Sequence, residues 1–199
     1  MDELRQAIAR RLVQSRLAVE ALDAEQAALL DVVAMIGNTI AGGGAVITCG
    51  NGGSAAQAMH LAEELLGRFR SSREPIRALC LNSDPTTLTC IANDFGYEEV
   101  FARQLRALGR AGDCLVVFST SGKSPNIRRA LEEARTIGLH CAGLLGGEGG
   151  PAAPLCHAAL ALRGCDSAAV QEAHLMALHI ICESLEPEAA ALSSSRRTR

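Results

Sequence analysis

Apolar residues recur at helical spacing through the first forty positions of the chain. Leu4, Ile8 and Leu12 begin a pattern with a period near 3.6 residues, which continues up to the glycines at 42–44. Three consecutive glycines are a strong helix stop. We therefore expect an N-terminal helical segment over residues 1–43, outside any sheet.

Beyond that segment, short apolar runs alternate with longer helical ones. Strands are predicted at Ala45–Cys49, Ala78–Leu81, Cys114–Ser119, His140–Leu145 and Ala158–Leu162. Helices are predicted at Ser54–Phe69, Tyr97–Leu108, Ser124–Ile137 and Ala168–Leu185. Short, wholly apolar strands between helices are typical of a parallel sheet covered on both faces. The sequence therefore predicts an α/β fold, a doubly wound three-layer sandwich with a central parallel sheet of about five strands.

Length and charge narrow the class of protein. A chain of 199 residues suits one α/β domain, expected over residues 44–186, and the Ser- and Arg-rich residues 187–199 are expected to be a disordered tail. The net charge is −3 and the basic residues form no stripe, so we expect no nucleic-acid partner. No apolar run approaches the ~20 residues that span a bilayer, and no secretion signal is present, so we expect a cytoplasmic protein without membrane contact.

The eight cysteines include no Cys-x-x-Cys pair. In a chain without a secretion signal, cysteines within apolar stretches act as small core hydrophobes. We predict no disulfide and no cysteine metal site.

Two Gly/Ser-rich loops, Cys49–Ser54 and Ser119–Ser124, each join a predicted strand to a predicted helix. The first N–H groups of a helix lack internal partners and attract anions, and ligands of doubly wound folds collect at the carboxyl ends of the strands. Ser124 and Pro125 suit the N-cap and the first helical position. The hydroxyls that suit a phosphate ester belong to Ser119, Thr120, Ser121 and Ser124. An ordinary Ser/Gly-rich turn is the alternative for either loop alone.

Two nucleotide-binding motifs are weighed against these loops. A Walker A loop needs glycine at the position of Val117, which excludes that motif. The segment Gly50–Ala55 does fit G-x-G-x-x-A, so a dinucleotide site is an alternative. That motif needs an acidic residue about 20 positions on, and Asp84 lies too far along.

His60 and Glu64 follow the first loop at i,i+4 spacing, which puts an imidazole and a carboxylate on one helical face. Such a pair can move protons or bind a metal. The last predicted helix carries His174 and His179, and spacing alone does not choose between them. For each histidine the alternative is a hydrogen-bonded core residue.

Five motifs in this order resemble those of the phosphoheptose isomerases in the sugar isomerase (SIS) domain family. They are Cys-Gly-Asn-Gly-Gly-Ser from Cys49, Met-His-Leu-Ala-Glu-Glu-Leu from Met59, Ala-Asn-Asp-Phe-Gly from Ala92, Ser-Thr-Ser-Gly-Lys-Ser from Ser119, and Gln-Glu-Ala-His from Gln171 onward to His179. The resemblance implies conversion of sedoheptulose 7-phosphate into D-glycero-D-manno-heptose 7-phosphate through an enediol. The family also contains non-catalytic regulators that bind sugar phosphates or proteins, and those tend to lose the carboxylate and the last histidine. This chain keeps both, which favours an enzyme.

The resemblance also implies roles for particular residues. Glu64 and His179 match the catalytic pair of the family. Substrate contacts map onto Asn51, Gly52, Gly53, Ser54, Asn93, Asp94, Ser119, Thr120, Ser121, Ser124 and Gln171. Some members bind zinc through residues that match His60, Glu64, Gln171 and His179. Family members are homotetramers with active sites at subunit contacts, which agrees with the surplus of apolar positions in residues 1–43.

Overall fold

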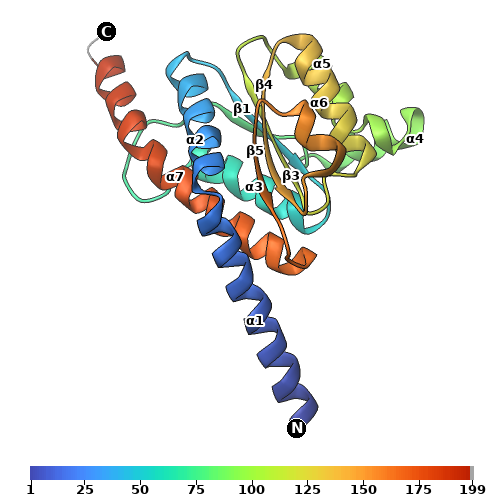
Figure 1. Ribbon diagram of the computed structural model, residues 1–199. Coiled ribbons are helices and arrows are strands. Elements are labelled where there is room, and N and C mark those ends of the chain that lie inside the picture. The colour runs from blue at the N-terminus through green and yellow to red at the C-terminus, as the bar shows by residue number, and fades with distance from the viewer. Residues whose placement is uncertain (198–199) are drawn as a thin grey trace.

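Five parallel strands form the central sheet in the order β2-β1-β3-β4-β5. The computed structural model describes residues 1–197, with side chains through Glu186 (Figure 1). The strands are β1 (Val46–Gly50), β2 (Ala78–Cys80), β3 (Cys114–Ser119), β4 (His140–Gly146) and β5 (Ala158–Leu162). The chain leaves β1 toward one edge of the sheet and returns to build β3 on its other side. The predicted doubly wound fold is confirmed, and its topological switch point lies between β1 and β3.

Helices cover both faces of the sheet. Every residue of the central strands β1 and β3 is therefore buried. One face carries α2 (Gln26–Ala41), α3 (Gly53–Leu66) and α7 (Ser167–Arg197), and the other carries α5 (Ala102–Leu108) and α6 (Pro125–Ile137) (Figure 1). Alternate side chains of β3 serve the two layers: Phe118 packs with the first set of helices and Val117 with the second. Each layer therefore has its own apolar core.

The N-terminal segment is two helices and not one. Glu25 separates helix α1 (Asp2–Ala24) from α2, which begins at Gln26. No glycine or proline marks this break. Helix α1 projects from the body of the protein as a long arm (Figure 1). Its buried residues are Ala18 and Leu22, while Leu4, Ile8 and Leu12 are more than half exposed.

Three short elements were not predicted as such from the sequence. Helix α4 (Pro85–Phe95) begins at the N-cap Asp84, whose Oδ1 accepts the N–H of Thr86 at 2.8 Å, and the 3₁₀ segment η1 (Tyr97–Glu99) follows it. Another 3₁₀ segment, η2 (Gly150–Leu155), lies between β4 and β5. The helix predicted from Tyr97 to Leu108 is therefore divided into η1 and α5.

The disordered tail expected over residues 187–199 stays a prediction. Helix α7 runs on past residue 187 to Arg197, and residues 198–199 lie outside the described part. The run Ala189–Leu192 consists of strong helix formers, which extend a helix already anchored upstream. Within the described residues, no helix is both long and apolar enough to cross a membrane.

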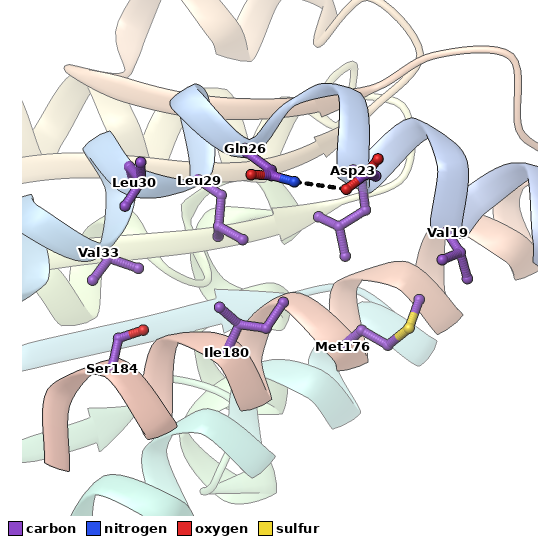
Figure 2. A pocket seen from close by; sticks show the side chains of 10 residues that line it. Val19, Asp23, Gln26, Leu29, Leu30, Val33, Met176, Ile180 and Ser184 are labelled. Carbon is purple, nitrogen blue, oxygen red and sulfur yellow. Dashed lines mark hydrogen bonds between the residues drawn. The ribbon is translucent and has the colours of Figure 1, made fainter.

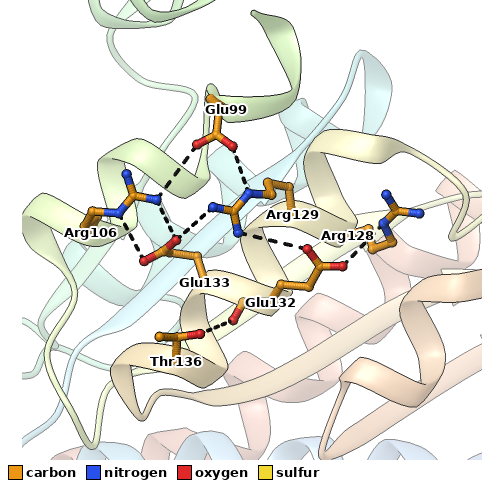
Figure 3. A network of polar contacts seen from close by, with 7 residues as sticks. All are labelled: Glu99, Arg106, Arg128, Arg129, Glu132, Glu133 and Thr136. Atoms are coloured by element: carbon orange, nitrogen blue, oxygen red, sulfur yellow. Dashed lines mark hydrogen bonds and ion pairs between the residues drawn. The ribbon is translucent and has the colours of Figure 1, made fainter. Parts of the chain in front are cut away.

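A network of charged side chains joins η1, α5 and α6 (Figure 3). Glu133, whose side chain is only 10% exposed, accepts two hydrogen bonds from Arg106, at 2.7 and 3.2 Å, and one from Arg129 at 3.2 Å. Arg129 also donates to Glu99 at 2.8 Å. The hydrogen bonds from Arg106, above all, lower the pKa of Glu133. The network fixes η1 against α6, which begins at the second Gly/Ser-rich loop.

Candidate active site

The two Gly/Ser-rich loops meet at the switch point, where β1 and β3 end side by side. Between them is a small cavity of about 70 Å³. Its lining residues are Asn51, Ser54, Phe118, Ser119, Thr120, Ser121, Ser124 and Gln171. The loops therefore converge on one site, as their positions in the sequence predicted.

The conformation of the first loop depends on its glycines and on the side-chain amide of Asn82. Asn82, just after β2, accepts the N–H of Gly50 at 3.1 Å and donates to its carbonyl at 2.9 Å, which extends the strand pairing by one step. Gly52 has a φ of 56°, a conformation that other residues rarely adopt. A Cβ on Gly53 would lie 2.6 Å from the amide of Gln171. The loop is thus shaped for close approach of α7.

The conformation of the second loop is stabilised by hydrogen bonds to its own hydroxyl groups. Ser119 Oγ accepts the N–H of Gly122 at 3.0 Å, and Ser121 Oγ accepts the N–H of Lys123 at 3.2 Å. A hydroxyl that accepts one bond still has a proton to donate. Ser124 occupies the N-cap position of α6, with Pro125 after it as predicted, but its side chain makes no cap hydrogen bond. These hydroxyls remain available to the oxygens of a phosphate.

His60, Glu64 and His179 come together at the contact between α3 and α7. His60 Nε2 lies 3.2 Å from Glu64 Oε1, and the rings of His60 and His179 are 5.2 Å apart between centroids. One ligand atom from each of the three residues lies within 4.8 Å of the others. All three side chains are partly exposed. Side chains that can exchange protons or ligate a metal ion thus share one partly exposed cluster.

The loop between α3 and β2 closes one side of this cluster. The ring of Phe69 lies 5.6 Å from that of His179. Glu186 of α7 accepts two backbone N–H groups of the loop, at 2.8 and 2.9 Å. Arg73 donates to two carbonyl groups in the last turn of α3, at 2.7 and 2.9 Å. The loop therefore fastens the helix that carries Glu64 to the helix that carries His179.

Comparisons with known proteins agree with this geometry. Residues 13–146 match the SIS domain family. A phosphoheptose isomerase of Desulfovibrio desulfuricans is 47% identical over 165 residues, which are 82% of this chain and 79% of that protein. The chain belongs to the phosphoheptose isomerase family. Solved phosphoheptose isomerases from Neisseria gonorrhoeae (34% identity, TM-score 0.86, 92% of this chain and 99% of that one) and Francisella tularensis (30%, 0.88, 94% and 100%) share its fold.

Three of the four residues predicted as zinc ligands lie in the cluster, and the fourth, Gln171, lines the cavity. Gln171 precedes His179 by eight residues on α7, about 12 Å of helix rise, and its side chain lies against Gly53. The main-chain carbonyl of Gln171 accepts a hydrogen bond from the side chain of Gln57. Helix α7 therefore contributes to both ends of the site.

Asn93 and Asp94, the remaining residues predicted to contact the substrate, lie near the end of α4. Both side chains are exposed, and Asn93 donates to Asp94 at 2.7 Å. In the part of the chain that the structure describes, neither lines the cavity. Their substrate contact stays a prediction. The nearby Tyr97 does reach the first loop, since its hydroxyl donates to Asn51 Oδ1 at 3.1 Å.

His174, the other histidine of α7, packs in the core. It is fully buried, its Nε2 lies 3.3 Å from the carbonyl oxygen of Leu145, and its ring meets that of Phe118 edge-on at 6.0 Å. Burial lowers the pKa of His174 to about 4, so the ring is neutral at pH 7. His140 begins β4 and His157 directly precedes β5, as strand-edge residues.

We expect His174 to make stability depend on pH below neutrality. As the pH falls from 6.5, the unfolded chain binds a proton on this residue, whereas the folded chain does so only near pH 4. The free energy of unfolding should therefore fall by about 3 kcal/mol between pH 6.5 and 4 because of this residue. Urea unfolding of wild type and His174→Gln at one protein concentration measures it. Equal pH dependence in both proteins would contradict the assignment.

The cysteines are mostly buried, as predicted, and all eight are free thiols. Burial raises the pKa of Cys182, one turn after His179, to about 12. It raises the pKa of Cys141 to about 11. Neither thiol is therefore ionised at neutral pH.

Sequence reasoning missed the side chains that position the first loop and the cluster. They are Phe69, Asn82, Tyr97 and Asn126. Asn126 had a local signal, because an asparagine in the first turn of a helix can bond to free N–H groups there. The others act across long sequence separations.

Proposed function

We propose that the protein isomerises sedoheptulose 7-phosphate to D-glycero-D-manno-heptose 7-phosphate. The observation that carries the proposal is the meeting of Glu64 with His179 in a chain whose loops also form a hydroxyl-lined cavity. The cavity suits the phosphate, and the cluster suits the exchange of a proton between neighbouring carbons. Membership of the phosphoheptose isomerase family supports the same substrate.

The length of the substrate suits the two parts of the site. Ser54 of the cavity precedes His60 by six residues on α3, about 9 Å of helix rise. An extended chain gains roughly 1.2 Å per bond, so the phosphorus and the reacting carbons of a heptose 7-phosphate are roughly 8–10 Å apart. A substrate that carries its phosphate several bonds from its carbonyl group matches this spacing.

In the proposed reaction Glu64 acts as the base and His179 as the acid. Glu64 removes the proton from carbon 1 of the ketose, and His179 protonates the carbonyl oxygen at carbon 2, which gives the enediol. Return of a proton to carbon 2, with loss of the hydroxyl proton at carbon 1, yields the aldose. The 3.2 Å contact with His60 restrains Glu64 in this position.

The cluster also fits a zinc ion. Imidazole nitrogens of His60 and His179 and a carboxylate oxygen of Glu64 are ordinary zinc ligands. Gln171, the fourth predicted ligand, lies at the loop cavity and not in this cluster. When bound, zinc would polarise the carbonyl and hydroxyl oxygens of the sugar. A Glu64 carboxylate that binds zinc is a weaker base, because the cation occupies its lone pairs. We therefore expect modest zinc affinity and a metal content that varies with preparation.

We also propose a homotetramer with active sites at subunit contacts. An apolar groove of about 410 Å³ lies between α2, the end of α1 and α7. Figure 2 shows the side chains that line it. Leu30 and Ile180 in this groove are 66% and 41% exposed, and Ile180 directly follows His179. The loop cavity of about 70 Å³ is much smaller than an ordinary ligand pocket, so a second copy would complete the site. A monomer in light scattering would contradict this assembly.

Proton NMR of sedoheptulose 7-phosphate with the purified protein tests the function. We expect the aldose product to appear, and deuterium from heavy water to enter carbon 2. Assays with added zinc and with a chelator decide whether metal is needed. Binding without turnover under every metal condition would favour the sugar-phosphate-binding regulator instead. A cytoplasmic location stays a prediction of the sequence.

A further inference from the structure

Asn51 of the first loop is held by side chains from two other elements. It forms a reciprocal pair with Asn126 of α6: Asn51 Nδ2 donates to Asn126 Oδ1 at 2.9 Å, and Asn126 Nδ2 donates to Asn51 Oδ1 at 2.8 Å. The hydroxyl of Tyr97 in η1 donates to the same Asn51 Oδ1 at 3.1 Å. Asn126 is only 2% exposed, whereas Asn51 lines the cavity.

A backbone group fixes which way these amides point. The N–H of Ile127 can only donate, and it lies 3.0 Å from Asn126 Oδ1. The other arm of Asn126 is therefore the NH₂ group, and the arm of Asn51 that faces it must be the oxygen. Two donors then fill both lone pairs of Asn51 Oδ1, while Nδ2 uses one of its two protons on Asn126. Among the described residues, nothing accepts the second proton.

We propose that Asn126 and Tyr97 are positioning residues that make Asn51 present an N–H donor, and never its oxygen, to the substrate. This inference rests on the proposed function for the identity of the substrate. The matching group on the substrate is an oxygen acceptor, either of the phosphate or of the sugar. An amide oxygen turned toward a phosphate would repel it, so the fixed orientation favours binding.

Asn126 has a second effect on the same site. By accepting the N–H of Ile127, Asn126 satisfies the N–H of the third residue of α6, which an N-cap side chain would otherwise take. Ser124 at the N-cap makes no such bond. Asn126 therefore leaves the Ser124 hydroxyl free for the ligand. The position of Tyr97 in η1 is restrained by Glu99, two residues later, which accepts a hydrogen bond from Arg129 of α6 at 2.8 Å (Figure 3).

Two uncharged variants test the proposal without touching the reacting groups. Tyr97→Phe removes only a hydroxyl from a 60% exposed side chain, so it should fold normally. Asn126→Leu keeps the size of the buried side chain and removes its hydrogen bonds. We expect KM for sedoheptulose 7-phosphate to rise about threefold in Tyr97→Phe and tenfold or more in Asn126→Leu, with kcat within about twofold of wild type. Asn38→Leu, which removes an exposed amide from α2, should leave both constants unchanged.

A measurement on the free protein separates this inference from the proposed function. In wild type, hydrogen exchange followed by NMR should show one protected and one unprotected side-chain amide proton on Asn51. Asn126→Leu should make both exchange freely. Unprotected protons in the wild type, or unchanged KM in both variants, would overturn the inference. A wild type that does not turn over sedoheptulose 7-phosphate would refute the proposed function, and the exchange pattern would then decide the inference alone.

Discussion

Glu64→Gln is expected to lower turnover of sedoheptulose 7-phosphate by about 10⁴-fold, at the upper end of what a general base contributes. Glutamine keeps the size of the side chain, and its oxygen can keep the 3.2 Å contact with His60. It has no basic group for the proton on carbon 1. The cavity between the loops is unchanged, so calorimetry should still detect binding of the sugar phosphate.

Glu63→Gln is the matched control, because it removes an exposed carboxylate from the neighbouring position of α3. We expect this variant to retain wild-type turnover. Activity in Glu64→Gln within tenfold of wild type would remove Glu64 from the mechanism. Loss of both turnover and binding would instead show that Glu64 maintains the site and is not its base.

His179→Ala is expected to slow turnover by ~10²–10⁴-fold, the range of a general acid. Leu178 and Ile181, which flank His179 on α7, are fully buried and anchor the helix in the core. The variant should therefore fold. The substitution removes the ring that meets both His60 and Phe69. Steady-state kinetics should therefore show the loss in kcat, with a smaller change in KM.

His140→Ala provides the control for His179→Ala. His140 is an exposed histidine at the start of β4, and the α3–α7 cluster does not include it. Its removal should leave kcat unchanged. Equal activity of His179→Ala and wild type, at any metal concentration, would contradict the assignment of the acid.

The fold was predictable because its signals are local. Apolar strands followed by Gly/Ser-rich loops gave all five strands to within a residue or two, and Ser124-Pro125 marked the start of α6. The break at Glu25 carries no glycine or proline, so periodicity alone could not find it. Helix α4 was missed although Asp84-Pro85 is a good start signal, because the β-branched threonines that follow favour a helix weakly.

The candidate site was predictable only in part, because its geometry depends on tertiary packing. The i,i+4 spacing placed His60 and Glu64 together, but only the packing of α7 on α3 decides that His179 joins them while His174 enters the core. The partners of Asn51 lie 46 and 75 residues away in the chain. No spacing rule connects residues so far apart.

The part of this chain that matches the SIS domain family does not contain all of the proposed reacting groups. The SIS domain match ends at residue 146, and it includes both loops and Glu64 but not Gln171 or His179. The two loops of the proposed phosphate site thus lie in the matched part of the chain, whereas the proposed acid lies on α7, beyond it. We expect a chain that lost His179 but kept Gln171 to become a sensor of the same sugar phosphate, because the lining of the cavity would be intact.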